Sequence, residues 1–347
     1  MDNSLIPMRI SVAMATYNGE KYIEEQLLSI CRQTRKPDEI VISDDGSGDA
    51  TLEIVERVSA SEVACGIDFV VITDNPRHGY CGNFEWAIRH TTGDLIFLSD
   101  QDDVWMPEKV ERICAVKTKY PEIACVIHNA QMIDGNNIPI QGEFHKAIKL
   151  DKLPTDAENL AWLDRNIFLE SSVSATLANG MVMCISKDFL EVILPFPKTK
   201  GLHDCWIGFC AICVDRCVYL AECLTQYRLH DTNLCGNSSR RMNLKVKFKR
   251  VATRVKSNES AVLERFCIGK AMLDQFTKYN LHDHSAYETA LKVYKIGEVQ
   301  AQAFQLGGIA GSIKLINLFC NNVRYRRSGR ADFFYQLVSV LFKRKNK

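Results

Sequence analysis

The first 135 residues alternate short apolar runs with segments of helical periodicity, and this alternation constrains the fold more than any other feature of the chain. Strands that are apolar at consecutive positions are typical of a parallel sheet that helices cover on both faces. The sequence therefore predicts an α/β fold with a mostly parallel central sheet. The expected strands are 9–15, 39–43, 69–73, 95–98 and 124–128, and the expected helices are 20–33, 50–58, 83–90 and 107–120.

The remaining chain is less regular. We expect a helix at 158–168, a strand at 179–185 that leaves a glycine, a helix at 203–214 and a strand at 218–221. From residue 243 onward the pattern is helical, without strand alternation.

Charge divides the chain into two parts. Residues 1–240 hold 22 Lys and Arg against 35 Asp and Glu, a net charge of −13, whereas residues 241–347 hold 21 against 7, a net charge of +14. We therefore expect one domain at 1–238 and a helical, basic C-terminal region at 239–347. The acidic first part argues against nucleic acid as a partner. The basic region predicts either contact with an anionic membrane surface or packing on the acidic domain.

The apolar runs are shorter than the roughly 18 residues that span a bilayer. The first residues also lack the basic and then apolar pattern of a signal peptide. We expect a cytoplasmic protein, which would lie peripherally on the inner face of the cytoplasmic membrane if its basic region contacts the membrane. The 14 cysteines stand largely in apolar surroundings, which favours reduced, buried thiols over disulfides or zinc ligands.

Polar clusters follow three of the first four expected strands, around Tyr17, Asp44 and Asp102. The carboxyl ends of parallel strands meet at one edge, where such sheets bind ligands. Carboxylates gathered there repel one another, so a cation, a ligand or a raised pKa must compensate. Mg²⁺ or Mn²⁺ suits such oxygen ligands and bridges to substrate phosphates. Ordinary turns and helix caps are the alternative explanation of each cluster taken singly.

The segments ISVAMATYNGEKYIEEQLLSICRQT, EIVISDDGSGDAT and GDLIFLSDQDDVWMPEKV closely resemble the N-terminal half of family 2 glycosyltransferases. The resemblance implies a GT-A fold with a nucleotide-binding half at about 8–135 and an acceptor half at about 136–238. It also implies transfer of a sugar from a nucleoside diphosphate. The SDQDDxW form is similar to the rhamnosyltransferase-like subgroup of bacterial surface polysaccharide synthesis.

The resemblance implies roles for residues of the donor site. Thr16 and Tyr17 would line the base pocket, and Asp44 would accept a hydrogen bond from the base. Asp45 would support the nucleoside or the turn. Asn83 would contact the nucleotide, or else be an ordinary residue of a helix start.

The segment Asp100-Gln101-Asp102 matches the DxD motif of the family. Asp102 would be the first metal ligand, and Asp100 would contact the ribose or the metal. His230 would complete the metal site or contact phosphate, unless it is a surface histidine. Arg228 would neutralise the charge of the diphosphate.

On the acceptor side, Gly180 resembles the glycine that begins the strand beside the acceptor. Asp204 falls at the position of the catalytic carboxylate and is the candidate base. His203 stands where the family often has an additional acid, and the resemblance implies that it contacts the substrate. Trp206 would offer an apolar face to a sugar, or else pack in the core.

These features predict a metal-dependent, inverting glycosyltransferase. Its donor would be a UDP- or dTDP-sugar such as one carrying rhamnose. Its acceptor would be a glycan or lipid-linked molecule of polysaccharide or O-antigen synthesis. Two alternatives stay open: a catalytically inactive GT-A-fold scaffold associated with a membrane, and a nucleotidyl or phosphoryl transferase. The absence of glycine-rich phosphate loops counts against the second.

Overall fold

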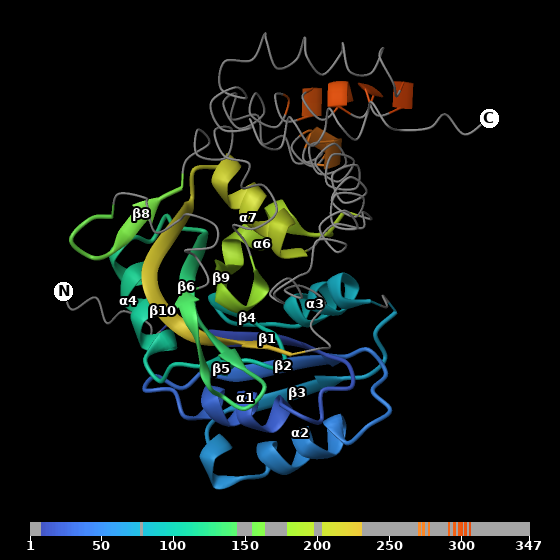
Figure 1. Ribbon diagram of the computed structural model, residues 1–347, viewed down its shortest axis with the longest axis vertical. Helices are drawn as coiled ribbons and strands as arrows, with labels where there is room; N and C mark the ends of the chain where they lie inside the picture. The colour runs from blue at the N-terminus through green and yellow to red at the C-terminus, as the bar shows by residue number, and fades with distance from the viewer. Residues whose placement is uncertain are drawn as a thin grey trace, which may run out of the picture.

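The computed structural model describes residues 8–76, 79–143, 155–163, 179–197 and 203–230, together with scattered helical positions between 270 and 306. A ten-stranded sheet runs through these residues in the order β3-β2-β1-β4-β9-β6-β10-β5, with β7 paired to β6 and β8 paired to β10. Helices α1 and α2 lie on one face of the N-terminal strands and α3 lies on the other (Figure 1).

The N-terminal half has the predicted alternation of strands and helices. Strands β1, β2, β3 and β4 pair in parallel, with β1 and β2 in the middle. The parallel pairing confirms the expected sheet. The strands are β1 (Ile10–Thr16), β2 (Glu39–Asp44), β3 (Asp68–Ile72) and β4 (Leu95–Ser99), and the helices are α1 (Ile23–Cys31), α2 (Thr51–Ser59), α3 (Tyr80–Arg89) and α4 (Lys109–Lys119), with the short η1 (Glu62–Ala64).

The second half extends the same sheet. Strand β9 runs antiparallel between β4 and β6, while β6 and β10 run parallel to each other. Strands β6 and β10 therefore point in the same direction as β1 and β4. The elements are β5 (Val104–Trp105), β6 (Cys125–Asp134), β7 (Pro139–Glu143), β8 (Leu160–Trp162), η4 (Gly180–Val182), β9 (Met183–Ser186), η5 (Lys187–Phe189), α6 (Leu190–Ile193), α7 (His203–Cys213) and β10 (Cys217–Leu229).

The helix expected at 158–168 is wrong in its described part, where strand β8 lies instead. The side-chain Oδ1 of Asp156 accepts hydrogen bonds from the backbone N–H groups of Glu158 (2.8 Å) and Leu160 (2.9 Å). Asn159 between them has a φ of 61°. This turn directs the chain into an extended strand, because a helix cannot pass through left-handed backbone. Residues 164–178 lie outside the described part of the chain.

Two apolar cores lie on the two faces of the sheet, as alternate residues of β1 illustrate. Val12 and Met14 pack with α1, α2 and α4, whereas Ala13 packs with α3, α6 and α7. The second core includes residues of α7, which begins at His203.

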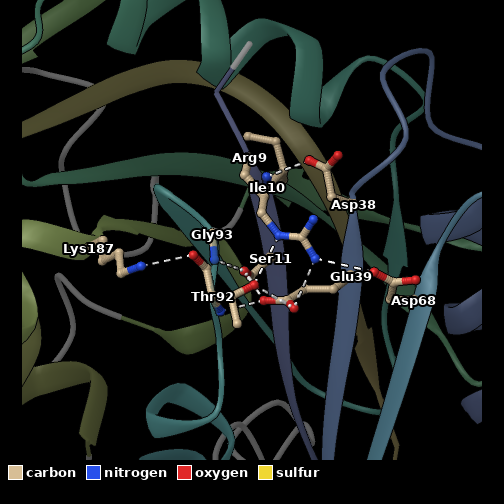
Figure 2. Close-up of polar contacts among 9 residues, drawn as sticks. All are labelled: Arg9, Ile10, Ser11, Asp38, Glu39, Asp68, Thr92, Gly93 and Lys187. Carbon is tan, nitrogen blue, oxygen red and sulfur yellow. Dashed lines mark hydrogen bonds and ion pairs between the residues drawn. The ribbon is translucent and has the colours of Figure 1, made fainter. Parts of the chain in front are cut away.

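A polar cluster around the buried Glu39 joins the amino ends of the N-terminal strands (Figure 2). Glu39, 2% exposed, accepts hydrogen bonds from Ser11 Oγ (2.5 Å) and from Thr92 N (2.5 Å) and Oγ1 (2.8 Å). Arg9 pairs with Glu39 at 3.5 Å and with Asp68 at 3.2 Å. Burial raises the pKa of Glu39, but the donors around it outweigh burial, so that its pKa is lowered. The cluster fixes the strands at the end opposite to their polar carboxyl ends.

The predicted boundary near 238 and nearly all of the basic region at 239–347 lie outside the described residues. The few positions of the basic region that the structure describes are helical. In the part of the chain that the structure describes, no helix combines the length and the apolar character needed to cross a bilayer.

Candidate functional site

The loops that follow β1, β2 and β4 are joined by side-chain hydrogen bonds. Thr16 Oγ1 donates to Asp44 Oδ2 at 2.8 Å. The side chain of Gln101 accepts from the backbone N of Tyr17 (2.9 Å) and donates to its backbone O (3.0 Å). A Cβ on Gly19 would lie 2.4 Å from Gln101 Oε1, so a larger residue at this position would displace the end of the Gln101 side chain. The three strand ends therefore meet at one rim, as their sequence pattern predicts.

The expected base-pocket residues differ in exposure. Tyr17 is 57% exposed, so the face of its ring is accessible, whereas Asp44 is 1% exposed. The carboxylate of Asp44 accepts hydrogen bonds from Thr16, from the backbone N–H of Gly46 (3.0 Å) and from both N–H (2.7 Å) and Oγ (2.6 Å) of Ser47. In this arrangement Asp44 orders the loop, and protein donors already surround its carboxylate.

Asp45 and Asn83 connect these loops to helix α3. Asp45 Oδ2 accepts from the backbone N of Gly79 at 2.8 Å, directly before the helix begins. Asn83, 2% exposed, donates from Nδ2 to the backbone O of Thr16 at 3.0 Å. These two hydrogen bonds link the ends of β2 and β1 to α3.

Four aspartates gather after β4 and at the start of α7: Asp100, Asp102, Asp103 and Asp204. Burial, followed by the charges of Asp102 and Asp204, raises the pKa of Asp100. Burial, followed by the charges of Asp102 and Asp100, also raises the pKa of Asp103. The residues therefore share one electrostatic environment that disfavours further negative charge and would favour a cation.

His230 joins this acidic group from the end of β10. Its Nε2 lies 2.8 Å from Asp102 Oδ2, and its ring centroid lies 4.9 Å from that of Tyr22. The side chain is 11% exposed. A partly buried contact with Asp102 does not fit the surface-loop alternative and brings together the two residues expected to share a metal.

Arg228 has different partners from those expected of a residue that neutralises a diphosphate. Its side chain is 1% exposed and pairs with Glu25 Oε2 at 2.7 Å. Its Nε donates to the backbone O of Asp102 at 2.7 Å, and its terminal nitrogen donates to Asn137. The guanidinium carbon lies 4.6 Å from the ring centroid of Tyr22. Arg228 thus holds the loop of Asp102 in place, and its buried guanidinium does not face outward.

Lys109 is a buried cation beneath the acidic loop that sequence reasoning missed. Its Nζ donates to the backbone O of Met181 and to Thr225 Oγ1, each at 3.0 Å, and lies 3.9 Å from the ring centroid of Trp105. Burial lowers the pKa of Lys109 to about 7 against the opposing charges of Asp103 and Asp100. In the sequence, this lysine looks like an ordinary charge near a helix start, and only its distant partners reveal its position.

At the start of α7, Gly180, His203 and Asp204 lie together. Burial raises the pKa of Asp204 to about 7, although Gly180 and Cys205 donate backbone hydrogen bonds to it. The backbone N of Cys205 lies 2.7 Å from Asp204 Oδ1. A carboxylate with a pKa near neutrality can exchange protons at the pH where enzymes work.

Trp206 fits the core interpretation of the two that the sequence left open. The residue is 2% exposed, and its Nε1 donates to the backbone O of Ile193 at 2.8 Å. It packs within the apolar core shared by α3, α6 and α7. No face of the indole is therefore available to a sugar in this arrangement.

The described residues contain no cluster of three or more His, Cys, Asp or Glu side chains in an arrangement that could hold a metal ion. Of the residues predicted to bind a metal, Asp102 and His230 are in contact, and Asp100 lies nearby. Carboxylate and imidazole are both ligands of divalent cations, and Mg²⁺ commonly uses only one or two protein carboxylates besides substrate phosphates and water. The chemistry of these residues therefore fits a divalent ion shared with a phosphate-bearing substrate.

Comparison with solved structures shows the class of fold. Over 96% of this chain and 90% of the other, the structure is similar to that of Staphylococcus aureus TarS residues 1–349 in complex with UDP-GlcNAc, with a TM-score of 0.53 and 16% sequence identity. The chain thus has a GT-A-type α/β fold with a mostly parallel sheet.

Comparison of sequences finds matches to known glycosyltransferases. Residues 11–175 match the family model described as glycosyl transferase family 2. An uncharacterized glycosyltransferase of a Nostoc strain is 27% identical over 228 residues, which are 65% of this chain and 66% of the relative. The dTDP-rhamnosyl transferase RfbG of Shigella flexneri is 42% identical over 101 residues, 28% of this chain and 34% of the relative. The matches thus cover just under two thirds of the first relative and about a third of the second.

Proposed function

We propose that this protein is a metal-dependent, inverting glycosyltransferase that moves a sugar from a nucleoside diphosphate to a hydroxyl of its acceptor. The observation that carries the proposal is the contact of Asp102 with His230 at 2.8 Å, beside Asp100 and Asp204, at the carboxyl rim of the sheet. The family 2 match of residues 11–175 gives independent support.

The donor would bind along the loops after β1, β2 and β4. The exposed ring of Tyr17 is suited to stack on a base. Thr16 and Asp44 order the pocket floor through their mutual hydrogen bond, with Asp45 and Asn83 behind them. A base can approach Asp44 only by replacing one of the protein donors that surround its carboxylate.

A Mg²⁺ or Mn²⁺ ion would be held by Asp102 and His230, with Asp100 near enough to take part. When bound, the ion would supply Lewis-acid stabilisation of the negative charge on the departing diphosphate. Arg228 and Glu25 keep the Asp102 loop in position.

Asp204 would act as the base. Its pKa of about 7 lets a neutral solution populate the ionised form, which can take the proton of an acceptor hydroxyl as that oxygen attacks the anomeric carbon. The oxygen–carbon bond forms while the bond to the diphosphate breaks, and a single in-line displacement inverts the anomeric centre.

The donor is proposed to be a dTDP- or UDP-sugar, with rhamnose as the first sugar to test. The partial match to the Shigella dTDP-rhamnosyl transferase supports rhamnose. A glycan or lipid-linked acceptor of O-antigen or other polysaccharide synthesis is the acceptor that the resemblance of the SDQDDxW segment to the rhamnosyltransferase-like subgroup implies. The net charge of +14 at 241–347 supports a peripheral position on the cytoplasmic membrane. Co-sedimentation with anionic and neutral vesicles at low salt tests that position, and equal recovery with both would contradict it.

The direct test is nucleotide release from dTDP-rhamnose and UDP-sugars with Mg²⁺ or Mn²⁺, with and without EDTA. Glycosyl transfer releases a nucleoside diphosphate, whereas nucleotidyl transfer from the same donors would release a sugar phosphate. A scaffold would bind donors without turnover. Release of a diphosphate that EDTA abolishes supports the proposal, and release that is insensitive to EDTA would refute its metal dependence.

Two variants separate the proposed roles. Asp204→Asn should abolish transfer while nucleotide binding stays, since it removes only the base. Asp102→Ala should also weaken metal-dependent donor binding. Asp188→Asn is a matched control, because this exposed carboxylate pairs with Arg216 away from the rim. Near wild-type turnover of Asp204→Asn would show that another group is the base.

A further inference from the structure

Tyr22 lies directly before α1, and its ring contacts two side chains from the end of β10. The residue is 9% exposed. Its ring centroid lies 4.9 Å from that of His230 and 4.6 Å from the guanidinium carbon of Arg228. His230 Nε2 in turn lies 2.8 Å from Asp102 Oδ2, and Arg228 Nε donates to the backbone O of Asp102 at 2.7 Å. Two groups that contact Asp102 therefore pack on one aromatic ring.

The start of α1 holds this ring in place. The backbone N of Tyr22 donates to the backbone O of Gly19 at 3.1 Å, and its backbone O accepts from the backbone N of Gln26 at 3.2 Å. Glu25, three residues further along the chain, pairs with Arg228 at 2.7 Å. Residues three apart lie side by side on a helix. Because a guanidinium is attracted both by an aromatic face and by a carboxylate, Tyr22 and Glu25 fix Arg228 together.

The hydroxyl of Tyr22 takes no part in these contacts. Its Oη is buried and has no hydrogen-bond partner among the residues that the structure describes. A Cβ on Gly135 would lie 3.0 Å from this oxygen, so the hydroxyl lies against the turn between β6 and β7. A buried hydroxyl without a partner costs stability. What this position contributes to the site is therefore the flat face of the ring.

Resting on the proposed function, we propose that Tyr22 is a positioning residue of the metal site, whose ring holds His230 and Arg228 and thereby keeps Asp102 in place for a divalent cation. Tyr22 acts through these neighbours and needs no contact with the ion or the substrate. Groups that orient metal ligands from outside typically change metal affinity by about 10–100-fold when they are removed.

The test compares the full-length wild type with Tyr22→Phe, which keeps the ring, and with Tyr22→Leu and Tyr22→Met, which keep apolar volume without a ring. Mn²⁺ affinity is measured from the electron paramagnetic resonance signal of the free ion, and Asp102→Ala sets the background. Tyr120→Leu is the matched control, because Tyr120 is partly buried, packs on Trp162 at 6.1 Å and precedes the amino end of β6. Calorimetry gives the affinity for UDP without metal, and thermal melting is measured in parallel.

Tyr22→Leu and Tyr22→Met should weaken Mn²⁺ binding by about tenfold or more, whereas Tyr120→Leu should not. Tyr22→Phe should bind Mn²⁺ like the wild type, with a Tm equal to or above it, because only the unpartnered hydroxyl is lost. The affinity for UDP without metal should stay unchanged in all three Tyr22 variants. Tyr22→Leu should also have a smaller effect in a His230→Ala background, where one group that it positions is gone.

Three results would overturn the inference: unchanged Mn²⁺ affinity in Tyr22→Leu and Tyr22→Met, weakened binding in Tyr22→Phe, or equal effects of Tyr22→Leu with and without His230. Unfolding of both Tyr22→Leu and Tyr22→Met at the assay temperature would also overturn it, since the ring would then serve core packing. A wild type that binds Mn²⁺ no better than Asp102→Ala would overturn the metal site of the proposed function, and this inference with it.

Discussion

Replacing Asp204 by Asn should make the metal-free protein more stable at alkaline pH. Burial raises the pKa of Asp204 from 3.8 to about 7. In the unfolded chain this carboxyl ionises near pH 4, but in the folded chain it stays protonated until about pH 7. Folding therefore takes up a proton between these values, and the contribution of Asp204 to stability falls as pH rises through this window.

The pKa values set the expected magnitude. At about 1.4 kcal/mol for each pKa unit, the ionised carboxylate costs the folded state about 4 kcal/mol above pH 7. Asparagine carries no charge at any pH, and its side-chain oxygen can still accept the hydrogen bond from Cys205 N. We expect Asp204→Asn to raise stability by up to about 4 kcal/mol at pH 8, and hardly at all near pH 4. For a domain of this size the gain corresponds to a Tm increase on the order of 10 °C.

The assay is thermal and urea unfolding in EDTA at several pH values between 4 and 8.5. Asp188→Asn makes the same chemical change at an exposed ion pair, where an effect of about 1 kcal/mol or less is expected. If Asp204→Asn were no more stable than the wild type at pH 8, Asp204 would not be a buried charge held at the expense of stability. The same would follow if its effect did not change with pH.

Three further predictions concern other parts of the structure. Gly180→Ala should cost about 1–3 kcal/mol of stability and reduce transfer, because its Cβ would lie 2.9 Å from His203 Nε2. Gly48→Ala, which meets open space, is its control in urea unfolding. Glu39→Gln should lower stability at pH 7 by about 1–3 kcal/mol. The pKa of Glu39 is lowered in the folded chain, so its carboxylate stabilises the fold only while it is ionised, and the difference should shrink below about pH 4. A difference that does not depend on pH would contradict this. Lys109→Met should be more stable relative to the wild type at pH 6 than at pH 9, because burial lowers the pKa of Lys109 to about 7 and its charge costs the folded state free energy below that pH. A relative urea midpoint that does not change between these pH values would refute this.

The N-terminal fold could be predicted because its strands are apolar at consecutive positions. Strands β1, β2 and β4 are buried on both faces, and this leaves a clear pattern in the sequence. The direction of parallel strands then places Thr16, Asp44 and Asp102 at one edge. Strand β9 was harder, because it has only four residues and its apolar pattern carries no information on direction.

The individual partners at the rim could not be predicted. Glu25 and Arg228 are 203 positions apart in the sequence, and neither stands in a pattern that indicates the other. The role of Arg228 toward the diphosphate came from the resemblance to the family, which does not show whether the side chain is buried. Its burial depends on how β10 returns along β6, which only the folded chain reveals.

The place of β9 has a consequence for synthesis on the ribosome. Strand β4 ends at Ser99, but its partner on the side away from β1 is β9, which begins at Met183. In a growing chain, one edge of β4 therefore stays unpaired until residues 183–186 have emerged from the ribosome. The edge of β6 that pairs with β9 stays unpaired over the same interval. Open strand edges pair readily with other chains. Protection of the emerging chain by a chaperone would matter most during this interval.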